Sequence, residues 1–383
     1  MISFNKPYFS GKETEYIRQA VESGKISGDG IFTKQCHKFF EDKYGFKKVL
    51  LTTSCTDALE MAAILINIQP GDEVIVPSYT FVSTANAFVL RGAKIVFADS
   101  NKLNPNIDAD LIESLITPKT KAIVPVHYAG IACDMDKIMA LADKYNLFVI
   151  EDAAQAVDSY YNQKPLGSIG HLAAFSFHET KNIISGEGGM LAINDERFVE
   201  RAEIIREKGT NRSQFFRGEV DKYNWVDIGS SYLPSEIISA FLFAQIENLE
   251  QIQNKRIKIW ERYYNNLLNL ELDGNINLPF IPNYATNNGH MFYLICKCLE
   301  FRSGLIKTLK ENGIQAVFHY LSLEKSPYFI DKHDGRFLPQ SEMYTDCLVR
   351  LPLYYDLQNN DIDDICNIIE SYLCKSKKVT VVH

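Results

Sequence analysis

Short runs of aliphatic and β-branched residues alternate with helical stretches through the first two-thirds of the chain. The runs predict strands at residues 48–52, 73–77, 94–98, 122–126, 147–151, 173–176 and 190–193. The stretches between them predict helices that include residues 56–66, 84–91 and 135–145. Such alternation is typical of a mostly parallel sheet that helices cover on both faces. The sequence therefore predicts an α/β fold, whose ligands bind at the carboxyl ends of the strands.

A long helical pattern with few breakers covers residues 235–270. We expect this helix to bridge to a smaller C-terminal α/β domain with strands at residues 291–297 and 315–318. At 383 residues, the chain is long enough for two domains. The predicted division is a large α/β domain of residues 1–245 and a smaller domain of residues 246–383.

Composition narrows the classes of partner. The net charge of −8 gives no sign of affinity for nucleic acid or acidic membranes, so neither is an expected partner. No apolar run reaches transmembrane length, and the N-terminus lacks the apolar core of a signal peptide. The eight cysteines show neither a zinc spacing nor a disulfide framework, so we expect no metal site and a cytoplasmic location. Residues 375–383 are expected to form a frayed or extended tail.

A carboxylate and a lysine each follow an apolar run. Asp152 comes directly after the predicted strand at residues 147–151, and Gln155 lies one turn later. Lys181 precedes the glycine-rich turn of residues 186–189, which lets the backbone come close to a ligand. Pyridoxal phosphate needs these groups, because a lysine forms the Schiff base and a carboxylate keeps the pyridine nitrogen protonated. Gln155 is then expected near the phenolic oxygen of the ring.

Both charged residues also have an ordinary structural interpretation. Most lysines are solvated surface groups, and an aspartate is often a capping residue or half of an ion pair. Burial of Lys181 would lower the pKa of its amine and favour the neutral form that a nucleophile needs. The patterns Asp-x-x-Gln, Ser-x-x-x-x-Lys and Gly-Glu-Gly-Gly in this order are far more specific than an aspartate and a lysine alone. The sequence therefore predicts a pyridoxal-phosphate enzyme of the aminotransferase type.

The cofactor phosphate needs donors, and the turn before the predicted helix at residues 56–66 can supply them. Free amides and the dipole at a helix start favour an anion. The turn consists of Ser54, Cys55 and Thr56. The alternative is a simple N-cap, in which a hydroxyl satisfies the orphan amides of the helix.

Two further residues are candidates for cofactor contacts. Ser176 lies five positions before Lys181 and is expected to donate to the phosphate, although an ordinary serine at a strand end is the alternative. Phe81 lies at a strand terminus, where its ring could stack on the pyridine. A buried core phenylalanine is the alternative for Phe81.

Over almost its whole length, the chain resembles the nucleotide-sugar aminotransferases of the DegT/StrS type, a pyridoxal-phosphate family of fold type I. The closer match is carried by residues 28–30, 78–88, 124–130, 207–218 and 317–320. Within the family, the chain is most similar to the transaminases that make dTDP-4-amino-4,6-dideoxy-D-galactose for enterobacterial common antigen. The resemblance implies pyridoxal 5'-phosphate as the cofactor and a homodimer with the active site at the subunit interface. It assigns the Schiff base to Lys181, the pyridinium contact to Asp152, and the phosphate to Ser176 and the turn at residues 54–56.

The resemblance also points to residues that would hold the substrate. They are Asp29, Arg212, Arg217, His319 and Tyr320. The two arginines suit bidentate contacts with a diphosphate or a carboxylate, and a solvated basic loop is the alternative. Many family members have an asparagine that reaches the phosphate across the dimer interface where this chain has Ser231. Because serine is shorter, that contact is expected to be either lost or mediated by water.

The resemblance implies transfer of the amino group of L-glutamate to C4 of dTDP-4-keto-6-deoxy-D-glucose. The products would be dTDP-4-amino-4,6-dideoxy-D-galactose and 2-oxoglutarate, and Lys181 would move the proton in both half-reactions. A transaminase that gives the gluco epimer or acts at C3 stays open, because the outcome depends on the pose of the sugar.

More distant alternatives each require a feature that this sequence does not show. A sugar dehydratase of the same fold would have histidine in place of Lys181. A cofactor-binding regulator would need a DNA-binding module, for which the expected domains leave no residues. A nicotinamide-dependent enzyme would need Gly-x-Gly-x-x-Gly after the first strand.

Overall fold

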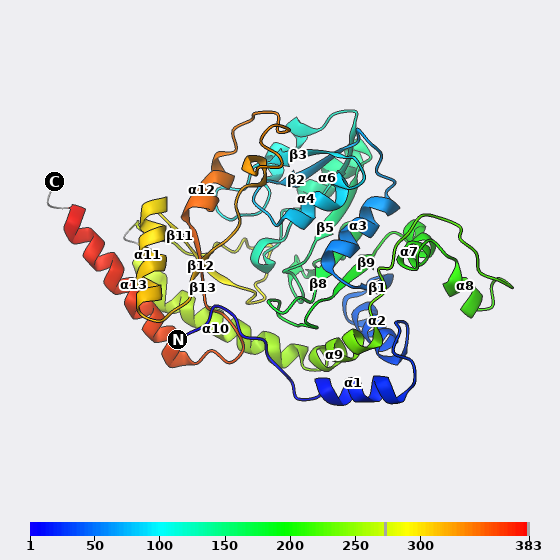
Figure 1. Cartoon of the computed structure of the whole chain (residues 1–383). Coiled ribbons are helices and arrows are strands. Elements are labelled where there is room, and N and C mark those ends of the chain that lie inside the picture. The colour runs from blue at the N-terminus through cyan, green and yellow to red at the C-terminus, as the bar shows by residue number, and fades with distance from the viewer. Residues whose placement is uncertain (272–273, 381–383) are drawn as a thin grey trace.

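The computed structural model describes residues 1–271 and 274–380 (Figure 1). Its centre is a seven-stranded sheet with the order β1-β9-β8-β5-β4-β2-β3. The strands are β1 (Lys48–Thr52), β2 (Glu73–Pro77), β3 (Lys94–Ala98), β4 (Thr120–Ile123), β5 (Phe148–Asp152), β8 (Leu172–Ser176) and β9 (Gly189–Ile193). Only β9 runs against its neighbours, and all other strands of this sheet point the same way. The predicted α/β fold with a mostly parallel sheet is confirmed.

Helices cover both faces of this sheet, because successive strand residues point to opposite sides. Leu50 and Val74 pack with helices α3, α4 and α7 on one face. Their chain neighbours Leu51 and Ile75 pack with α2, α6 and α9 on the other. The bounds are α2 (Ile31–Tyr44), α3 (Cys55–Leu65), α4 (Val82–Val89), α5 (Ala109–Ile112), α6 (Met135–Tyr145), α7 (Val199–Arg206), α8 (Arg212–Phe216) and α9 (Glu236–Ile246).

A smaller antiparallel sheet follows, with the order β10-β11-β13-β12. Its strands are β10 (Ile276–Asn277), β11 (Phe292–Cys296), β12 (Val317–Phe318) and β13 (Leu348–Leu351). Helices α10, α11 and α13 pack on one face of it around a separate apolar core. The other α-helices are α1 (Glu13–Glu22), α10 (Leu249–Glu271), α11 (Leu299–Glu311), α12 (Pro339–Cys347) and α13 (Asn359–Thr380), and β6 (Tyr160–Tyr161) and β7 (Lys164–Pro165) form a hairpin.

The predicted helix over residues 235–270 is wrong in one respect, because it is two helices, α9 and α10. The Asn248 side chain donates to the carbonyl of Ala244 (2.9 Å) and so competes with continued helical bonding. The N-terminus also departs from the predicted division, since Ile2 forms a bridge with Ile314 in the C-terminal part. The domain boundary at residues 245–246 stays a prediction.

Most predicted element ends lie within two residues of the observed ones, and two differ by more. The strand predicted at residues 122–126 ends at Ile123, and Val126 keeps only an isolated bridge to Asp152. The tail predicted over residues 375–383 is wrong in its first part, because α13 continues to Thr380. Residues 381–383 lie outside the described residues.

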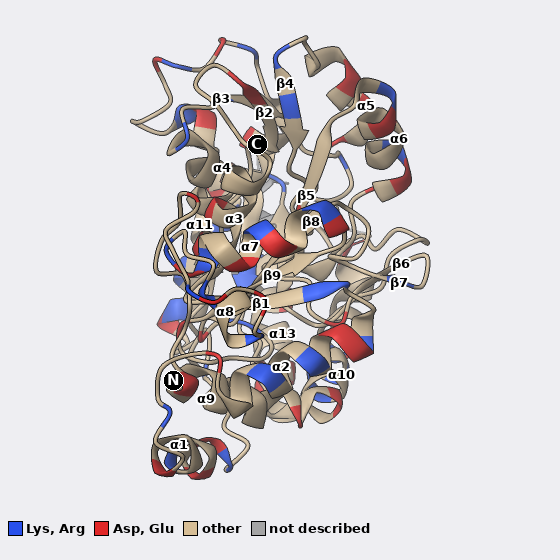
Figure 2. Cartoon of the chain, turned by 90° about the vertical axis from the view of Figure 1, so that its right-hand side faces the viewer, with Lys and Arg blue, Asp and Glu red and all other residues tan. Residues whose placement is uncertain are grey.

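Charges of both signs are interspersed over the face of the molecule in Figure 2. With a net charge of −8, an anionic ligand must be held by local donors rather than by a general positive field. Among the helices of the described residues, none combines the length and the apolar character that a bilayer crossing requires.

Candidate active site

The topology of the large sheet gathers the predicted cofactor residues at one edge. Asp152 ends β5 and Ser176 ends β8, which is the parallel neighbour of β5. Gly189, at the start of β9, pairs with Ser176 on one side and with Thr52, the last residue of β1, on the other. The turn after β1 and the ends of β5 and β8 therefore lie at the carboxyl edge where ligands of such sheets bind.

Asp152 is buried, with its carboxylate oxygens fixed by two donors. Thr84 Oγ1 donates to Oδ2 at 2.7 Å, and the amide of Ala154 donates to Oδ1 at 3.1 Å. Burial raises the pKa of Asp152, and these two hydrogen bonds together with the charge of Lys181 oppose the rise. A cationic partner in the site would favour the ionised carboxylate further.

Lys181 lies in the loop between β8 and β9. The loop is closed by backbone hydrogen bonds from Phe177 to Gly188 and from Glu179 to Gly186, both at 2.9 Å. Burial lowers the pKa of the Lys181 amine, and the nearby Asp152 acts in the opposite direction. The two groups that pyridoxal phosphate requires therefore face the same site and influence each other's ionisation.

The turn before α3 combines a helix cap with free donors. Ser54 Oγ accepts from the amide of Asp57 (3.1 Å), as the N-cap interpretation predicts. The amides of Cys55 and Thr56 donate to no other described residue. Thr56 Oγ1 lies 2.8 Å from Ser83 Oγ, so a further hydroxyl joins the group. Capping and anion binding are therefore compatible, because the Ser54 hydroxyl accepts from the helix and keeps its own proton for a ligand.

Aromatic residues form a wall beside this edge. Phe81 is 56% exposed, and its ring lies 6.2 Å from that of Tyr320. His319 stacks on Tyr320 at 3.6 Å and its Nδ1 lies 2.7 Å from the hydroxyl of Tyr128. Gln155 joins the same group, since its Nε2 donates to the Tyr320 hydroxyl at 3.2 Å. The structure thus brings Phe81, Gln155, His319 and Tyr320 together.

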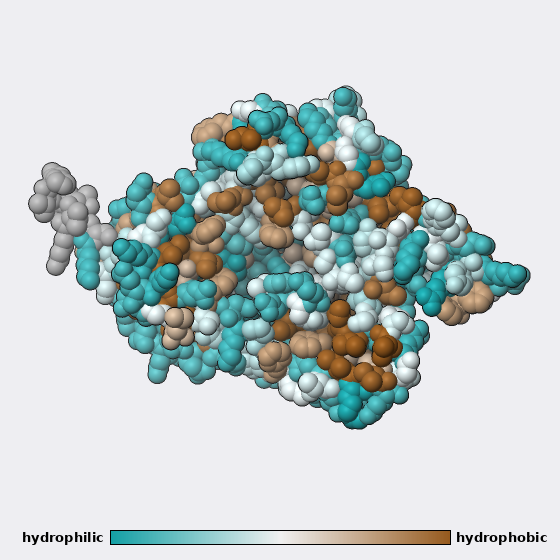
Figure 3. Space-filling model, viewed as in Figure 1, coloured by the Kyte–Doolittle hydropathy of each residue, from teal (hydrophilic) through white to brown (hydrophobic). Residues whose placement is uncertain are grey.

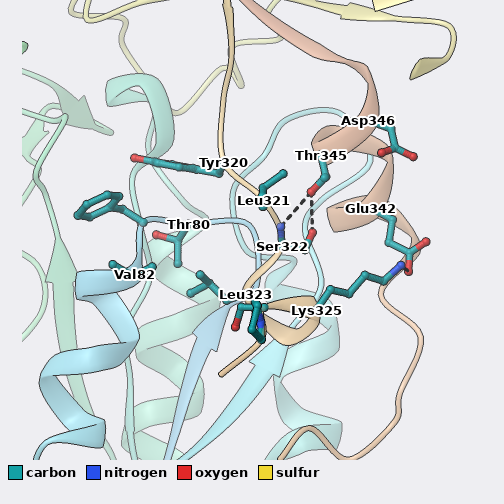
Figure 4. A pocket seen from close by; sticks show the side chains of 13 residues that line it. Thr80, Val82, Tyr320, Leu321, Ser322, Leu323, Lys325, Glu342, Thr345 and Asp346 are labelled. Atoms are coloured by element: carbon teal, nitrogen blue, oxygen red, sulfur yellow. Dashed lines mark hydrogen bonds and ion pairs between the residues drawn. The ribbon is translucent and has the colours of Figure 1, made fainter. Parts of the chain in front are cut away.

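A cavity of about 530 Å³ opens beside Phe81 and Tyr320 (Figure 4). Its floor contains Leu323, and its far side carries Lys325, which forms an ion pair with Glu342. This volume is in the range of pockets that hold small organic ligands. The cavity therefore extends the candidate site beyond the groups that would hold a cofactor.

Four of the predicted ligand contacts lie elsewhere in the single chain. Asp29 accepts from Arg206 at 2.5 Å, and Ser231 is exposed and forms a bridge with Glu207. Arg212 forms an ion pair with Glu207 at 3.4 Å. Arg217 forms an ion pair with Glu203 at 2.7 Å. The lobe that carries α8 projects from the end of the molecule, away from β8 and the central sheet, in Figure 1.

Arg350 is a residue of this region that the sequence analysis missed. It lies in β13, a strand that was not predicted, and its positive charge acts on Lys181 and His319. The signal was present, because Arg350 is the single charged residue within the apolar run Leu348–Leu351. A charged residue inside an apolar strand is rarely buried unless it has a counter-charge or a functional role.

The donor set fits pyridoxal phosphate. A buried carboxylate, an amine with a lowered pKa and a helix start with free amides are each suited to a different part of that molecule. Close packing supports the cradle, since a Cβ on Gly189 would lie 2.3 Å from the carbonyl carbon of Ser54. Glycine at this position lets the phosphate turn approach β9.

Comparisons with known proteins agree with this geometry. The spore coat polysaccharide biosynthesis protein SpsC of Bacillus subtilis is 33% identical over 377 residues, which is 96% of each chain. The structure of DesV from S. venezuelae is similar with a TM-score of 0.87 and 27% identity, over 97% of this chain and 98% of DesV. The PLP form of the putative sugar aminotransferase Spr1654 from Streptococcus pneumoniae shares the fold, with a TM-score of 0.87 and 24% identity over 97% and 98% of the chains.

The model of the DegT/DnrJ/EryC1/StrS aminotransferase family matches residues 7–370. This match spans the carboxyl edge of the large sheet, the aromatic wall and the smaller sheet. The chain therefore belongs to the DegT/DnrJ/EryC1/StrS family of sugar aminotransferases, which use pyridoxal phosphate as their cofactor.

Proposed function

We propose that this enzyme transfers the amino group of L-glutamate to C4 of dTDP-4-keto-6-deoxy-D-glucose. The products are dTDP-4-amino-4,6-dideoxy-D-galactose and 2-oxoglutarate. The observation that carries the proposal is a convergence of segments. Tyr79, Tyr128 and the His319–Tyr320 pair come from three of the stretches that resemble the galacto-forming transaminases. The Tyr128 ring lies 5.7 Å from the ring of Tyr79, 5.4 Å from that of His319 and 6.1 Å from that of Tyr320.

In this proposal Lys181 is the catalytic residue. When bound, the cofactor would supply an electron sink through its protonated pyridine ring, and the Asp152 carboxylate would accept a hydrogen bond from the ring N–H. The Lys181 amine attaches the cofactor, removes the proton from the donor Cα and later delivers a proton to C4 of the sugar. The lowered pKa of Lys181 supports this role, because only the neutral amine can accept a proton.

The remaining cofactor contacts follow from the donors at the sheet edge. In this proposal the phosphate is held by Ser54, the amides of Cys55 and Thr56, and Ser176. The proposal is supported by the free amides at the start of α3 and by the ends of β1 and β8, which lie at the same edge of the sheet. Phe81 covers the ring from its exposed position. Gln155 lies close enough to Tyr320 for both to border the ring, which agrees with a contact near the phenolic oxygen.

A homodimer supplies the remaining substrate contacts in this proposal. Phe216, Trp225 and Val226 around α8 are 66%, 81% and 52% exposed, which is unusual for large apolar side chains unless a partner covers them. In a dimer, this lobe can carry Arg212, Arg217 and Ser231 to the site of the other subunit. In this proposal Asp29 contacts the substrate while it keeps its ion pair with Arg206. The cavity of about 530 Å³ gives room for the nucleotide sugar.

The product made from dTDP-4-keto-6-deoxy-D-glucose and L-glutamate tests the proposal. Mass spectrometry should show replacement of the keto oxygen by an amine. In the NMR spectrum, a small coupling between H3 and H4 identifies the galacto product, and a large coupling identifies the gluco epimer. Lys181→Ala should give no product, whereas Lys119→Ala, a change of an exposed lysine, should match the wild type. An amine at C3, a gluco product or turnover by Lys181→Ala would each contradict the proposal.

A further inference from the structure

The Asp152 carboxylate is held by one side-chain hydroxyl. Thr84 Oγ1 donates to Oδ2 at 2.7 Å, and the amide of Ala154 donates to Oδ1 at 3.1 Å. Within the part of the chain that the structure describes, no other side chain donates a hydrogen bond to this carboxylate. Asp152 and Thr84 are both buried, so solvent competes little for the bond. Thr84 is therefore the side chain that sets the direction of the Asp152 carboxylate.

A second threonine determines how the Thr84 hydroxyl is oriented. Thr80 Oγ1 lies 2.9 Å from Thr84 Oγ1, and a threonine hydroxyl carries only one proton. Because Thr84 gives its proton to Asp152, it must accept the proton of Thr80. Thr80 also lines the large cavity, where Figure 4 shows it near Val82. A directed chain of hydrogen bonds therefore runs from the wall of the cavity to the Asp152 carboxylate.

The first turn of α4 brings these hydroxyls to the carboxylate. Thr80 precedes the N-cap residue Phe81, and Thr84 is the third residue of the helix. The same turn exposes the Phe81 ring and places the Ser83 hydroxyl 2.8 Å from that of Thr56 in the phosphate turn. One helical turn thus contributes to three separate parts of the candidate cofactor site.

His127 is also close to Asp152, but its ring proton is used elsewhere. Its Nδ1 accepts from the amide of Cys133 at 3.2 Å, so the proton lies on Nε2 and is donated to Glu151 at 2.9 Å. Glu151 also accepts from three backbone amides of residues 167–170, which keeps it in place beneath the sheet edge. The imidazole therefore does not replace the Thr84 hydroxyl.

The Thr84 bond also bears on the charge of Asp152. Burial raises the pKa of Asp152, and the Thr84 hydrogen bond is the strongest influence in the opposite direction, ahead of the charge of Lys181. Cys55 and Tyr320 lie near this carboxylate as well, and burial raises the pKa of each, so both are neutral at pH 7. Without the Thr84 bond, the uncharged carboxyl group would be favoured.

We propose, on the basis of the proposed function, that Thr84 is a positioning residue that keeps Asp152 ionised and directed at the pyridine nitrogen of the cofactor. Thr80 holds Thr84 in the donating orientation. A carboxylate paired with a protonated ring competes with a neutral pair, in which the proton lies on the carboxyl oxygen. A hydroxyl that donates to the carboxylate stabilises the charged pair, because hydrogen bonds to ionised groups are the stronger ones. Thr84 thus supports the electron sink through Asp152.

Cofactor preference tests this inference without turnover. In the carbocyclic analogue of pyridoxal phosphate, a C–H group replaces the ring nitrogen, so the ring cannot pair with Asp152 and its other contacts are kept. Absorbance titration with each compound gives two affinities, and their ratio reports the contact at the ring nitrogen. The wild type should prefer pyridoxal phosphate, and Asp152→Asn should lose most of that preference.

Thr84→Val keeps the β-branched shape and removes the hydroxyl. The preference for pyridoxal phosphate should fall about tenfold to 100-fold in this variant and in Thr84→Ala. Thr84→Ser keeps the hydroxyl and should restore the preference to within about threefold of wild type. Thr117→Val is the matched control, because Thr117 donates to the Glu73 carboxylate at 2.6 Å outside the site. A purely structural defect would weaken both compounds equally, and an unchanged ratio in Thr84→Val would overturn the inference.

A double-mutant cycle tests the role of Thr80. Thr80→Val should lower the preference about threefold to tenfold in wild type and no further in Thr84→Val, because its effect passes through the Thr84 hydroxyl. Additive effects of the two changes would overturn this role.

The same titrations distinguish failure of this inference from failure of the proposed function. If the wild type makes no amino sugar while the ratios fall as described, the proposed reaction fails and the inference stands. If Asp152→Asn loses the preference and Thr84→Val keeps it, Asp152 retains its proposed role and only the inference fails.

Discussion

At the scale of single residues, Asp152 and Lys181 respond in opposite directions to the same buried environment. Burial raises the pKa of Asp152 and lowers the pKa of Lys181, so each group shifts toward its neutral form. For Lys181 this shift favours the nucleophile. Asp152 must be ionised to pair with the cofactor ring, so the rise of its pKa must be reversed. A protonated pyridine nitrogen next to the carboxylate would supply the positive charge that lowers this pKa. The carboxylate is therefore suited to a cationic ring and costly without one.

Asp152→Asn tests this coupling. The amide has the same shape, so cofactor should still bind, but it cannot stabilise a pyridinium and transamination should slow by about 100-fold to 1000-fold. Single-turnover absorbance with L-glutamate measures the rate. Asp158→Asn is a matched control, since Asp158 has a φ of +60° that asparagine tolerates and accepts a bond from Tyr44 outside the site. An unchanged rate in Asp152→Asn would remove Asp152 from its proposed role.

A second prediction concerns the pH dependence of the free energy of unfolding, and it rests on His37. Its Nε2 accepts from the amide of Leu51 (3.0 Å), and burial together with the Arg206 charge lowers its pKa to about 3. The unfolded chain takes up this proton near pH 6.5 and the folded chain does not. The contribution of His37 is therefore complete above pH 6.5 and is lost as the pH falls from 6.5 toward 3. From pH 7 to pH 5, the loss should be about 2 kcal/mol.

Urea unfolding of wild type and His37→Gln at pH 7 and pH 5 checks this prediction. Glutamine keeps an acceptor for Leu51 and does not titrate, so the unfolding free energy of the variant should fall less between the two values. Because all other titrating groups are shared, the difference between the two proteins reports His37 alone. Equal falls in both proteins would contradict the prediction.

At the scale of elements, β9 decides where the phosphate turn lies. It is antiparallel between β1 and β8, so its first residue, Gly189, meets the last residues of both neighbours. The helix α3 starts directly above it, with Ser54 in contact with the Gly189 backbone. One strand of reversed direction therefore joins the phosphate turn after β1 to the Ser176 end of β8.

Gly189→Ala should weaken cofactor binding. The added Cβ would lie 2.3 Å from the carbonyl carbon of Ser54, which is backbone and cannot rotate away, so the turn must move. Overpacking of this kind costs about 1 to 3 kcal/mol, and we expect cofactor affinity to fall by roughly tenfold to 100-fold. Absorbance titration of the apoenzyme with pyridoxal phosphate measures it. Gly335→Ala, also at a glycine but with open space around it, should leave the affinity unchanged.

At the scale of the whole molecule, the chain exposes apolar side chains in places that a monomer would not favour. Figure 3 shows an apolar group where α1 and α9 lie in Figure 1. Val21 and Ile237 of these helices are 54% and 38% exposed, and Ile31 of α2 is 58% exposed. The projecting α8 lobe carries a second such group. Both surfaces agree with the proposed homodimer, since apolar patches of this kind mark association sites.

Complementation between inactive variants tests whether Arg212 serves the site of the partner subunit. Lys181→Ala and Arg212→Met should each be strongly impaired alone. Mixed dimers would contain one site with both changes and one intact site, so activity should recover to about a quarter of wild type in an equal mixture. A mixture of Lys181→Ala with Asp152→Asn is the control, because both residues belong to one chain's site and no intact site can form. Absence of recovery in the first mixture would place Arg212 outside the shared site.

The elements and site residues that the sequence predicted correctly are those whose pattern lies within a few neighbouring residues. The strands β1, β2 and β3 have the predicted bounds, because each is a short apolar run between turn residues. Asp152 and Lys181 were found for a similar reason, because Asp152 directly follows an apolar run and Lys181 lies between an apolar run and a glycine-rich turn. Arg350 was missed, because its meaning depends on a partner strand, β11, whose register places Tyr293 beside it.

The sequence by itself determined the α/β class, the cofactor and the residues at the carboxyl ends of the strands, since hydrophobic periodicity and turn chemistry are properties of neighbouring residues. Only the tertiary structure decided which distant groups share a buried layer. The sequence does not distinguish Arg212 and Arg217, which form ion pairs, from Arg350, whose guanidinium is unpaired within the described residues. They differ because folding gives the first two arginines carboxylates and, among the described residues, leaves the third without one, and the cost of burying a charge depends on that partner.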